Sequence, residues 1–85
     1  MYQEPTNYDL LAEAIVAQAA KDYLELRKFL HNTREGKETR KAAKELRDIR
    51  KFFTSRWYKT LTDVDGNYLM ERLDKEFEEW KKEQV

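Results

Sequence analysis

The segment LRDIRKFFTSRWYKTL, residues 46–61, decides the fold that this sequence predicts. Its apolar residues recur at spacings of three and four, which is typical of the buried face of a helix: Leu46, Ile49, Phe53, Trp57 and Leu61. Thr54-Ser55 interrupts this pattern, because both side chains favour helix caps over helix interiors. We therefore expect a helix over 38–54, a kink or break near Ser55, and a short helical extension over 56–61.

Two further helices are predicted on either side of this segment. Upstream, Thr6 and Asp9 have the spacing of a capping box and precede an apolar stripe, which predicts a helix over 7–31. Downstream, residues 62–65 have a similar form and predict a helix over 63–82. Gly66 is then either a close-packing residue or the last turn residue before that helix. The chain is predicted to be all-α, a compact three-helix bundle forming one domain over 1–85.

Composition limits the classes of function. The 85 residues contain no Cys and one His, which excludes disulfides and thiolate zinc sites and suits a reducing cytosol. There is no apolar run long enough to span a bilayer and no recognisable signal peptide, so a cytoplasmic protein is expected. Asp63–Asn67 resembles a calcium loop, but the alignment puts Leu61 and Arg72 at ligand positions. We expect no catalytic residue, metal or cofactor, and no enzymatic activity.

Charge is balanced over the whole chain and segregated along it. The totals are 17 basic and 17 acidic residues, yet residues 34–59 contain ten basic and four acidic ones, a local charge of +6. At 100° per residue, one basic row lies within about 60° on the side of the second helix opposite its apolar stripe. Its members are Arg40, Lys44, Arg47 and Lys51. An acidic row lies opposite the apolar stripe of the last helix, and its members are Glu71, Asp74 and Glu78.

Each row has an ordinary interpretation and a functional one. Amphipathic helices must place charge outside, so both rows can be solvated faces. The basic row could instead contact phosphates or an acidic protein, and the acidic row could dock to a basic groove. The basic row has no side chain placed to read base edges, so any binding of nucleic acid through it should be weak and indifferent to sequence.

Four aromatic residues lie within 52–58, more than one helical face can bury. The spacing predicts a core corner made by Phe53 and Trp57. Phe52 and Tyr58 fall off that stripe, and such surplus aromatics are candidates for a partner interface, as Trp57 is if its ring is not buried.

Residues 52–73, FFTSRWYKTLTDVDGNYLMERL, and residues 14–23, AIVAQAAKDY, resemble segments of small phage- and prophage-encoded helical proteins of Gram-positive bacteria. The resemblance covers part of the chain. It implies a phage protein that acts in the cytoplasm of a bacterial host. The family has no settled biochemical activity, so the resemblance assigns no site residue.

These observations predict a non-enzymatic protein that binds a host or phage protein, with inhibition of a bacterial defence system as one form of that role. The alternative is an accessory nucleic-acid-binding protein that uses the basic row. A homodimer that buries Leu10, Ala14 or Leu24 is a third interpretation.

Overall fold

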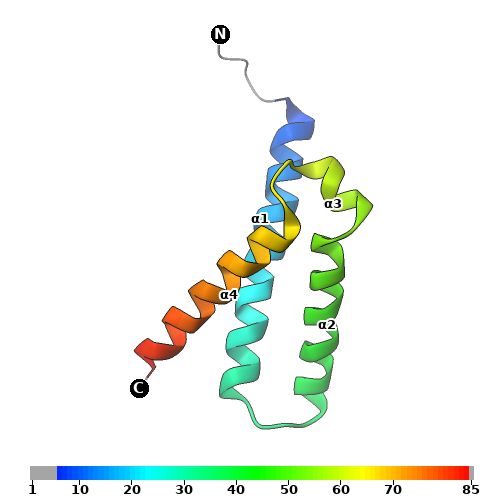
Figure 1. Cartoon of the computed structure of the whole chain (residues 1–85). Coiled ribbons are helices and arrows are strands. Elements are labelled where there is room, and N and C mark those ends of the chain that lie inside the picture. Colours follow the sequence, from blue (N-terminus) through cyan, green and yellow to red (C-terminus); the bar gives the residue numbers. More distant parts are fainter. Residues whose placement is uncertain (1–5, 85) are drawn as a thin grey trace.

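Helices make up most of the described part of the chain, residues 6–84 of this computed structural model (Figure 1). The helices among these residues are α1 (Asn7–Asn32), α2 (Lys37–Phe53), α3 (Arg56–Leu61) and α4 (Gly66–Glu83). The prediction of an all-α bundle is confirmed. Helices α1, α2 and α4 are its three long helices, and α3 is the short helical turn expected near Ser55.

Side-chain caps explain where α1 and α3 begin. The Thr6 hydroxyl accepts a hydrogen bond from the Asp9 N–H at 3.1 Å, and the Asp9 carboxylate accepts one from the Thr6 N–H at 3.0 Å, which confirms the capping box. The hydrogen bonds from Thr6 lower the pKa of Asp9, and the bond from the Thr6 backbone N–H has the larger effect. At the second break, the Ser55 hydroxyl accepts a hydrogen bond from the Tyr58 N–H at 3.2 Å. The predicted break at Thr54-Ser55 therefore ends α2 and caps α3.

The last helix begins at Gly66, three residues later than predicted. Asp65 is its N-cap, since the carboxylate accepts hydrogen bonds from the N–H groups of Asn67 and Tyr68 at 2.8 and 3.1 Å. Thr62 belongs to the end of α3 instead, where its N–H donates to the Tyr58 carbonyl. The capping pattern was present in the sequence, but the cap is its last residue and not its first.

The helices form two layers. Helices α1 and α2 are an antiparallel hairpin, α4 crosses α1 obliquely on one face of that hairpin, and α3 lies near the end of α2 (Figure 1). The bundle measures 51 × 27 × 19 Å. No helix within residues 6–84 is long and apolar enough to cross a membrane.

The core lies where all four helices meet. Its central cluster is Tyr23, Leu46, Phe53, Tyr58 and Leu73. The Tyr23 and Phe53 rings meet edge to face with centroids 6.1 Å apart, a favourable geometry for aromatic pairs. Leu24 packs against this cluster, so it is not free for the predicted dimer contact, whereas Leu10 and Ala14 are exposed.

Candidate functional site

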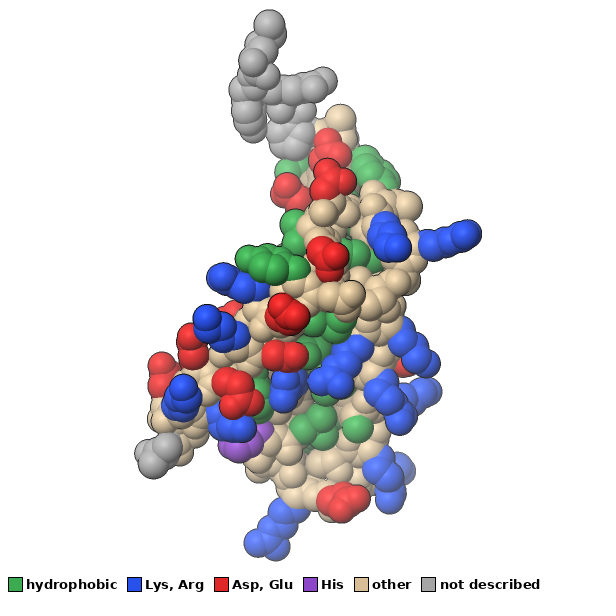
Figure 2. All heavy atoms as spheres, in the orientation of Figure 1, with side chains coloured by type: hydrophobic (Ala, Val, Ile, Leu, Met, Phe, Trp, Pro, Cys, Tyr) green, Lys and Arg blue, Asp and Glu red, His purple; other side chains and the backbone are tan. Residues whose placement is uncertain are grey.

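The predicted basic row is an exposed face of α2. All four of its members are exposed, and none of them forms an ion pair with another residue of the described chain: Arg40, Lys44, Arg47 and Lys51. Figure 2 shows Lys and Arg side chains gathered along the α2 edge of the molecule. The row is therefore available to an acidic partner over about three turns of helix.

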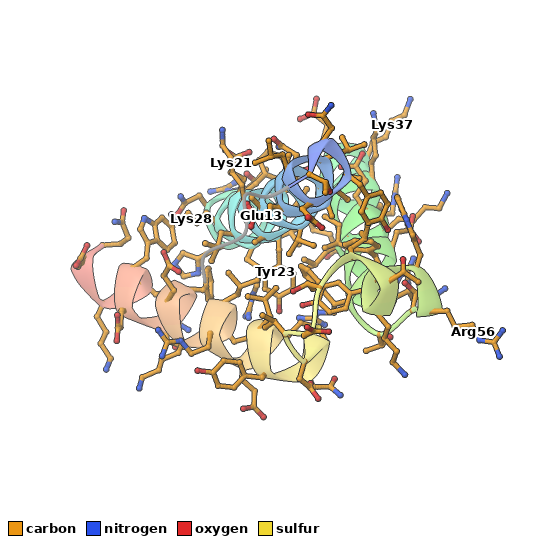
Figure 3. The ribbon with its side chains drawn as sticks, turned by 90° about the horizontal axis from the view of Figure 1, so that it is seen from above. Glu13, Lys21, Tyr23, Lys28, Lys37 and Arg56 are labelled. Carbon is orange, nitrogen blue, oxygen red and sulfur yellow. The ribbon has the colours of Figure 1, made fainter. Side chains whose placement is uncertain are left out.

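The predicted acidic row is not one face. Asp74 turns toward α1, where its carboxylate accepts hydrogen bonds from the Tyr23 hydroxyl and, at 2.6 Å, from the Arg27 guanidinium. Figure 3 shows Tyr23 pointing into the space between α1 and α4. Asp74 directly follows the buried Leu73, so it lies at the flank of α4, where the long side chains of α1 reach it. Its role is to tie α1 to α4.

The other two members of that row behave as surface residues. Glu78 pairs with Lys81 one turn later, with Oε2 and Nζ 3.2 Å apart, and Glu71 is exposed. Exposed pairs of this kind contribute little to stability. The three carboxylates thus do not form a common docking surface.

Two aromatic residues near the start of α3 have the opposite burial to that predicted. Phe53 is buried as expected, but Trp57 is 57 % exposed and Tyr58 only 1 % exposed. The prediction extended one helical stripe from Phe53 to Trp57. Because the chain leaves the helix at Thr54-Ser55 and begins α3 with a new phase, Tyr58 and not Trp57 faces the core. Tyr58 is therefore not a surface residue.

Trp57 and its neighbours in the chain form an aromatic–basic corner, which we define as Lys51, Phe52, Arg56 and Trp57. The half-buried Phe52 ring holds Trp57 edge to face, with centroids 5.3 Å apart. Lys51 and Arg56 are exposed, and Arg56 points away from the bundle (Figure 3). Lys59 is also exposed, but it lines the hollow beside Tyr58. The corner thus combines a supported, solvent-facing indole with two cations.

A groove between α1 and α2 was not predicted. It encloses about 600 Å³ and is lined by Asp22, Glu25, Leu26, Phe29, Glu45, Asp48 and Ile49, which we call the acidic groove. It faces away from α4: Phe29 and His31 lie about 160° apart around α1, and the His31 ring contacts Phe77 and Trp80 of α4. The only signal in the sequence was a pair of carboxylates on each helix. These pairs are brought together only when α1 packs against α2.

A second hollow, of about 450 Å³, lies beside the loop between α3 and α4. Tyr58 contributes to its wall, and the Tyr58 hydroxyl has no hydrogen-bond partner among the described residues. Burial, and to a smaller extent the charge of Asp65, raises the pKa of Tyr58. Within residues 6–84 there is no group of three or more His, Cys, Asp or Glu side chains placed to hold a metal ion. The candidate sites on the described residues are therefore three surfaces: the basic row, the aromatic–basic corner and the acidic groove.

Comparisons of the chain with protein-family models, with curated proteins and with solved structures found no match.

Proposed function

We propose that this chain is a small non-enzymatic protein that binds a host or phage protein through the aromatic–basic corner and the adjoining basic row of α2. The observation that carries this proposal is the Trp57 indole, which is 57 % exposed and lies next to the exposed Arg56. The rings of Tyr8 and Tyr68 are similarly exposed, at 58 % and 55 %, but each carries a polar hydroxyl.

An exposed indole at this place is a cost to the isolated protein. A large aromatic side chain buries about 150–250 Å² in a core, and each Å² is worth about 25 cal/mol. Because Trp57 is 57 % exposed, more than half of this burial free energy is not realised in the isolated protein. The indole nevertheless keeps an edge-to-face contact with Phe52. Trp, Tyr and Arg are enriched at the energetic centres of protein interfaces, where the partner supplies the missing burial. Trp57 beside Arg56 matches that description.

The charges around Trp57 indicate the partner's chemistry. Lys51 and Arg56 lie in the corner, and the basic row continues along α2. A partner with an apolar pocket for the indole and an acidic rim would be complementary in both respects. The phage-like segment, residues 52–73, contains the corner apart from Lys51, and this supports a role inside a bacterial host, with inhibition of a defence system as the specific form proposed.

The test is affinity capture from lysate of a Gram-positive host, with the partner identified by mass spectrometry. The wild-type chain should retain a specific protein that Trp57→Ala and the double variant Arg47→Glu/Lys51→Glu lose. The matched control is Arg72→Glu/Lys75→Glu, which reverses two exposed cations on α4. Capture that is equally strong with Trp57→Ala, shown by circular dichroism to be folded, would contradict the proposal.

Nucleic acid is the second candidate, and the same corner favours it. An exposed indole flanked by cations can stack on an unpaired base while the basic row follows the phosphates. Affinity should then be weak, should fall steeply between low and moderate salt, and should be higher for single strands than for duplex. Titration followed by tryptophan fluorescence at two salt concentrations measures this, in a Trp80→Phe variant so that Trp57 is the one indole. Absence of binding at low salt would contradict this alternative.

A further inference from the structure

We propose that the acidic groove between α1 and α2 binds a basic amphipathic α-helix from a partner protein. This inference rests on the proposed function, in that the chain acts by binding proteins, and it adds a second surface on another face and of opposite charge.

The spacing of the lining residues fits a helix. On α1 the groove is lined at intervals of three, one and three residues, and on α2 at intervals of three and one, so both walls present the same side of successive turns. The α1 wall is about 10 Å long, which is two helical turns. The groove volume of about 600 Å³ accommodates a few side chains from one face of a helix. Docking of an amphipathic helix into such a groove uses anchors at the same intervals.

The chemistry of the walls defines the occupant. Leu26, Phe29 and Ile49 make an apolar floor, and Phe29 is 37 % exposed. Four carboxylates surround this floor, and no basic residue lines the groove: Asp22, Glu25, Glu45 and Asp48. None of the four forms an ion pair within residues 6–84, although Asp22 accepts a hydrogen bond from Gln18 Nε2 at 2.8 Å. The complementary ligand has an apolar ridge flanked by Lys or Arg.

Each wall of the groove carries two like charges at a short spacing, although Lys21, Lys41 and Lys44 stand four residues before Glu25, Glu45 and Asp48. Asp22 and Glu25 are three residues apart on α1, and Glu45 and Asp48 are three residues apart on α2, a spacing at which like charges repel. Gln or Lys at one position of each pair would serve a solvated face with less repulsion. A cationic helix seated between the two pairs would relieve both.

A second copy of this chain does not present a basic amphipathic helix of the required length. Its aromatic–basic corner combines an exposed ring with cations, but α3 has six residues and Trp57 is its one exposed large apolar side chain. Its exposed leucines at the start of α1, Leu10 and Leu11, lie beside the acidic Asp9 and Glu13. The basic row of α2 contains no apolar residue. The occupant is therefore a helix of a different protein.

The experiment is a titration of the isotope-labelled full chain with two synthetic 15-residue helical peptides, followed by nuclear magnetic resonance. Both peptides present Leu at intervals of three and four residues in an Ala background, with Lys flanking the Leu ridge in one and Glu in the other. The Lys peptide should bind at least about tenfold more tightly than the Glu peptide. It should shift the amide signals of Leu26, Phe29 and Ile49. Equal affinity for the two peptides, or shifts confined to other surfaces, would overturn the inference.

Variants locate the contact. Glu25→Gln/Asp48→Asn, which removes two charges, and Phe29→Ala, which removes an exposed ring, should each weaken binding of the Lys peptide by about tenfold. The control Glu71→Gln/Glu83→Gln removes the same charge from exposed positions of α4 and should leave affinity within about twofold. An equal loss in the control would show general attraction to an acidic protein and would overturn the groove assignment. None of these variants alters Trp57, so failure here leaves the partner capture through the aromatic–basic corner as a separate result.

Discussion

The backbone of Gly66, the first residue of α4, lies directly against the carbonyl group of Phe53, the last residue of α2. A Cβ atom at position 66 would overlap the Phe53 carbonyl oxygen, and Gly66 is buried. Of the two interpretations of this glycine offered by the sequence, close packing is therefore confirmed. The contact joins the end of one long helix to the beginning of another without any side chain.

Gly66→Ala should destabilise the protein by about 3 kcal/mol or more, because the overlapping atom is backbone and cannot rotate away. Urea unfolding followed by circular dichroism measures the change. Gly36→Ala is the control, since a Cβ there has no atom within 4 Å, and it should cost no more than about 1 kcal/mol. Similar losses at the two glycines would contradict the close packing.

Trp57→Ala should lower the free energy of unfolding by only about 1 kcal/mol, because the ring is mostly exposed and contacts mainly Phe52. Phe53→Ala, at a residue that is 1 % exposed, should cost about 3–5 kcal/mol. The same urea titration applied to both variants tests whether Trp57 lies outside the core. If Trp57→Ala lowered the free energy of unfolding as much as Phe53→Ala does, the indole would be a core residue, contrary to the structure.

Tyr58→Phe should leave stability unchanged or raise it by about 1 kcal/mol. The buried hydroxyl has no protein hydrogen-bond partner, so folding removes it from water without compensation. Differential scanning calorimetry of the variant beside Tyr68→Phe, where the ring is exposed, gives the comparison. A clear drop in melting temperature for Tyr58→Phe alone would show that the hydroxyl is satisfied in the folded protein.

Asp74→Asn should destabilise by about 1 kcal/mol, because Asp74 accepts hydrogen bonds from both Tyr23 and Arg27 but keeps a partly exposed side chain. Glu78→Gln, which breaks the exposed pair with Lys81, should change stability by no more than about 0.5 kcal/mol. Chemical denaturation of the two variants under one condition compares them directly. Equal effects would mean that the Asp74 network is no more than a surface ion pair.

Stability should fall at alkaline pH. Burial first, and then the hydrogen bond to Asp74, raise the pKa of Tyr23 above its ordinary value of 10.0, and burial also raises the pKa of Tyr58. The folded state therefore holds these protons at a pH where the unfolded chain has released them. The stabilisation is complete below about pH 10 and is lost as the pH rises through the folded-state values. In urea titrations from pH 9 to 11.5, Tyr23→Phe should flatten the decline, whereas Tyr8→Phe, at an exposed ring, should not.

Local signals in the sequence were sufficient for most of the fold. Thr6 with Asp9, and Thr54 with Ser55, carry their capping chemistry in the side chains themselves, so α1, the end of α2 and the start of α3 could be predicted. The basic row also followed, because residues on one helix have a known angular relation.

Relations between helices could not be predicted in the same way. The inward turn of Tyr58 depends on the phase with which α3 restarts, and the partnership of Asp74 depends on the crossing of α1 by α4. The acidic groove has one wall on each of two helices, and neither wall is distinctive by itself. Periodicity assigns a residue to a face of its own helix, but does not identify which neighbour that face meets.

The break at Thr54-Ser55 has an evolutionary consequence. Because α3 begins anew after this break, position 57 faces solvent and position 58 faces the core, although the two are adjacent in the chain. Position 58 is constrained by folding, whereas position 57 can change residue type at little cost to the domain. Related chains that keep Ser55 and an aromatic residue at position 58 can therefore diverge at position 57 and acquire new binding preferences while retaining the same bundle.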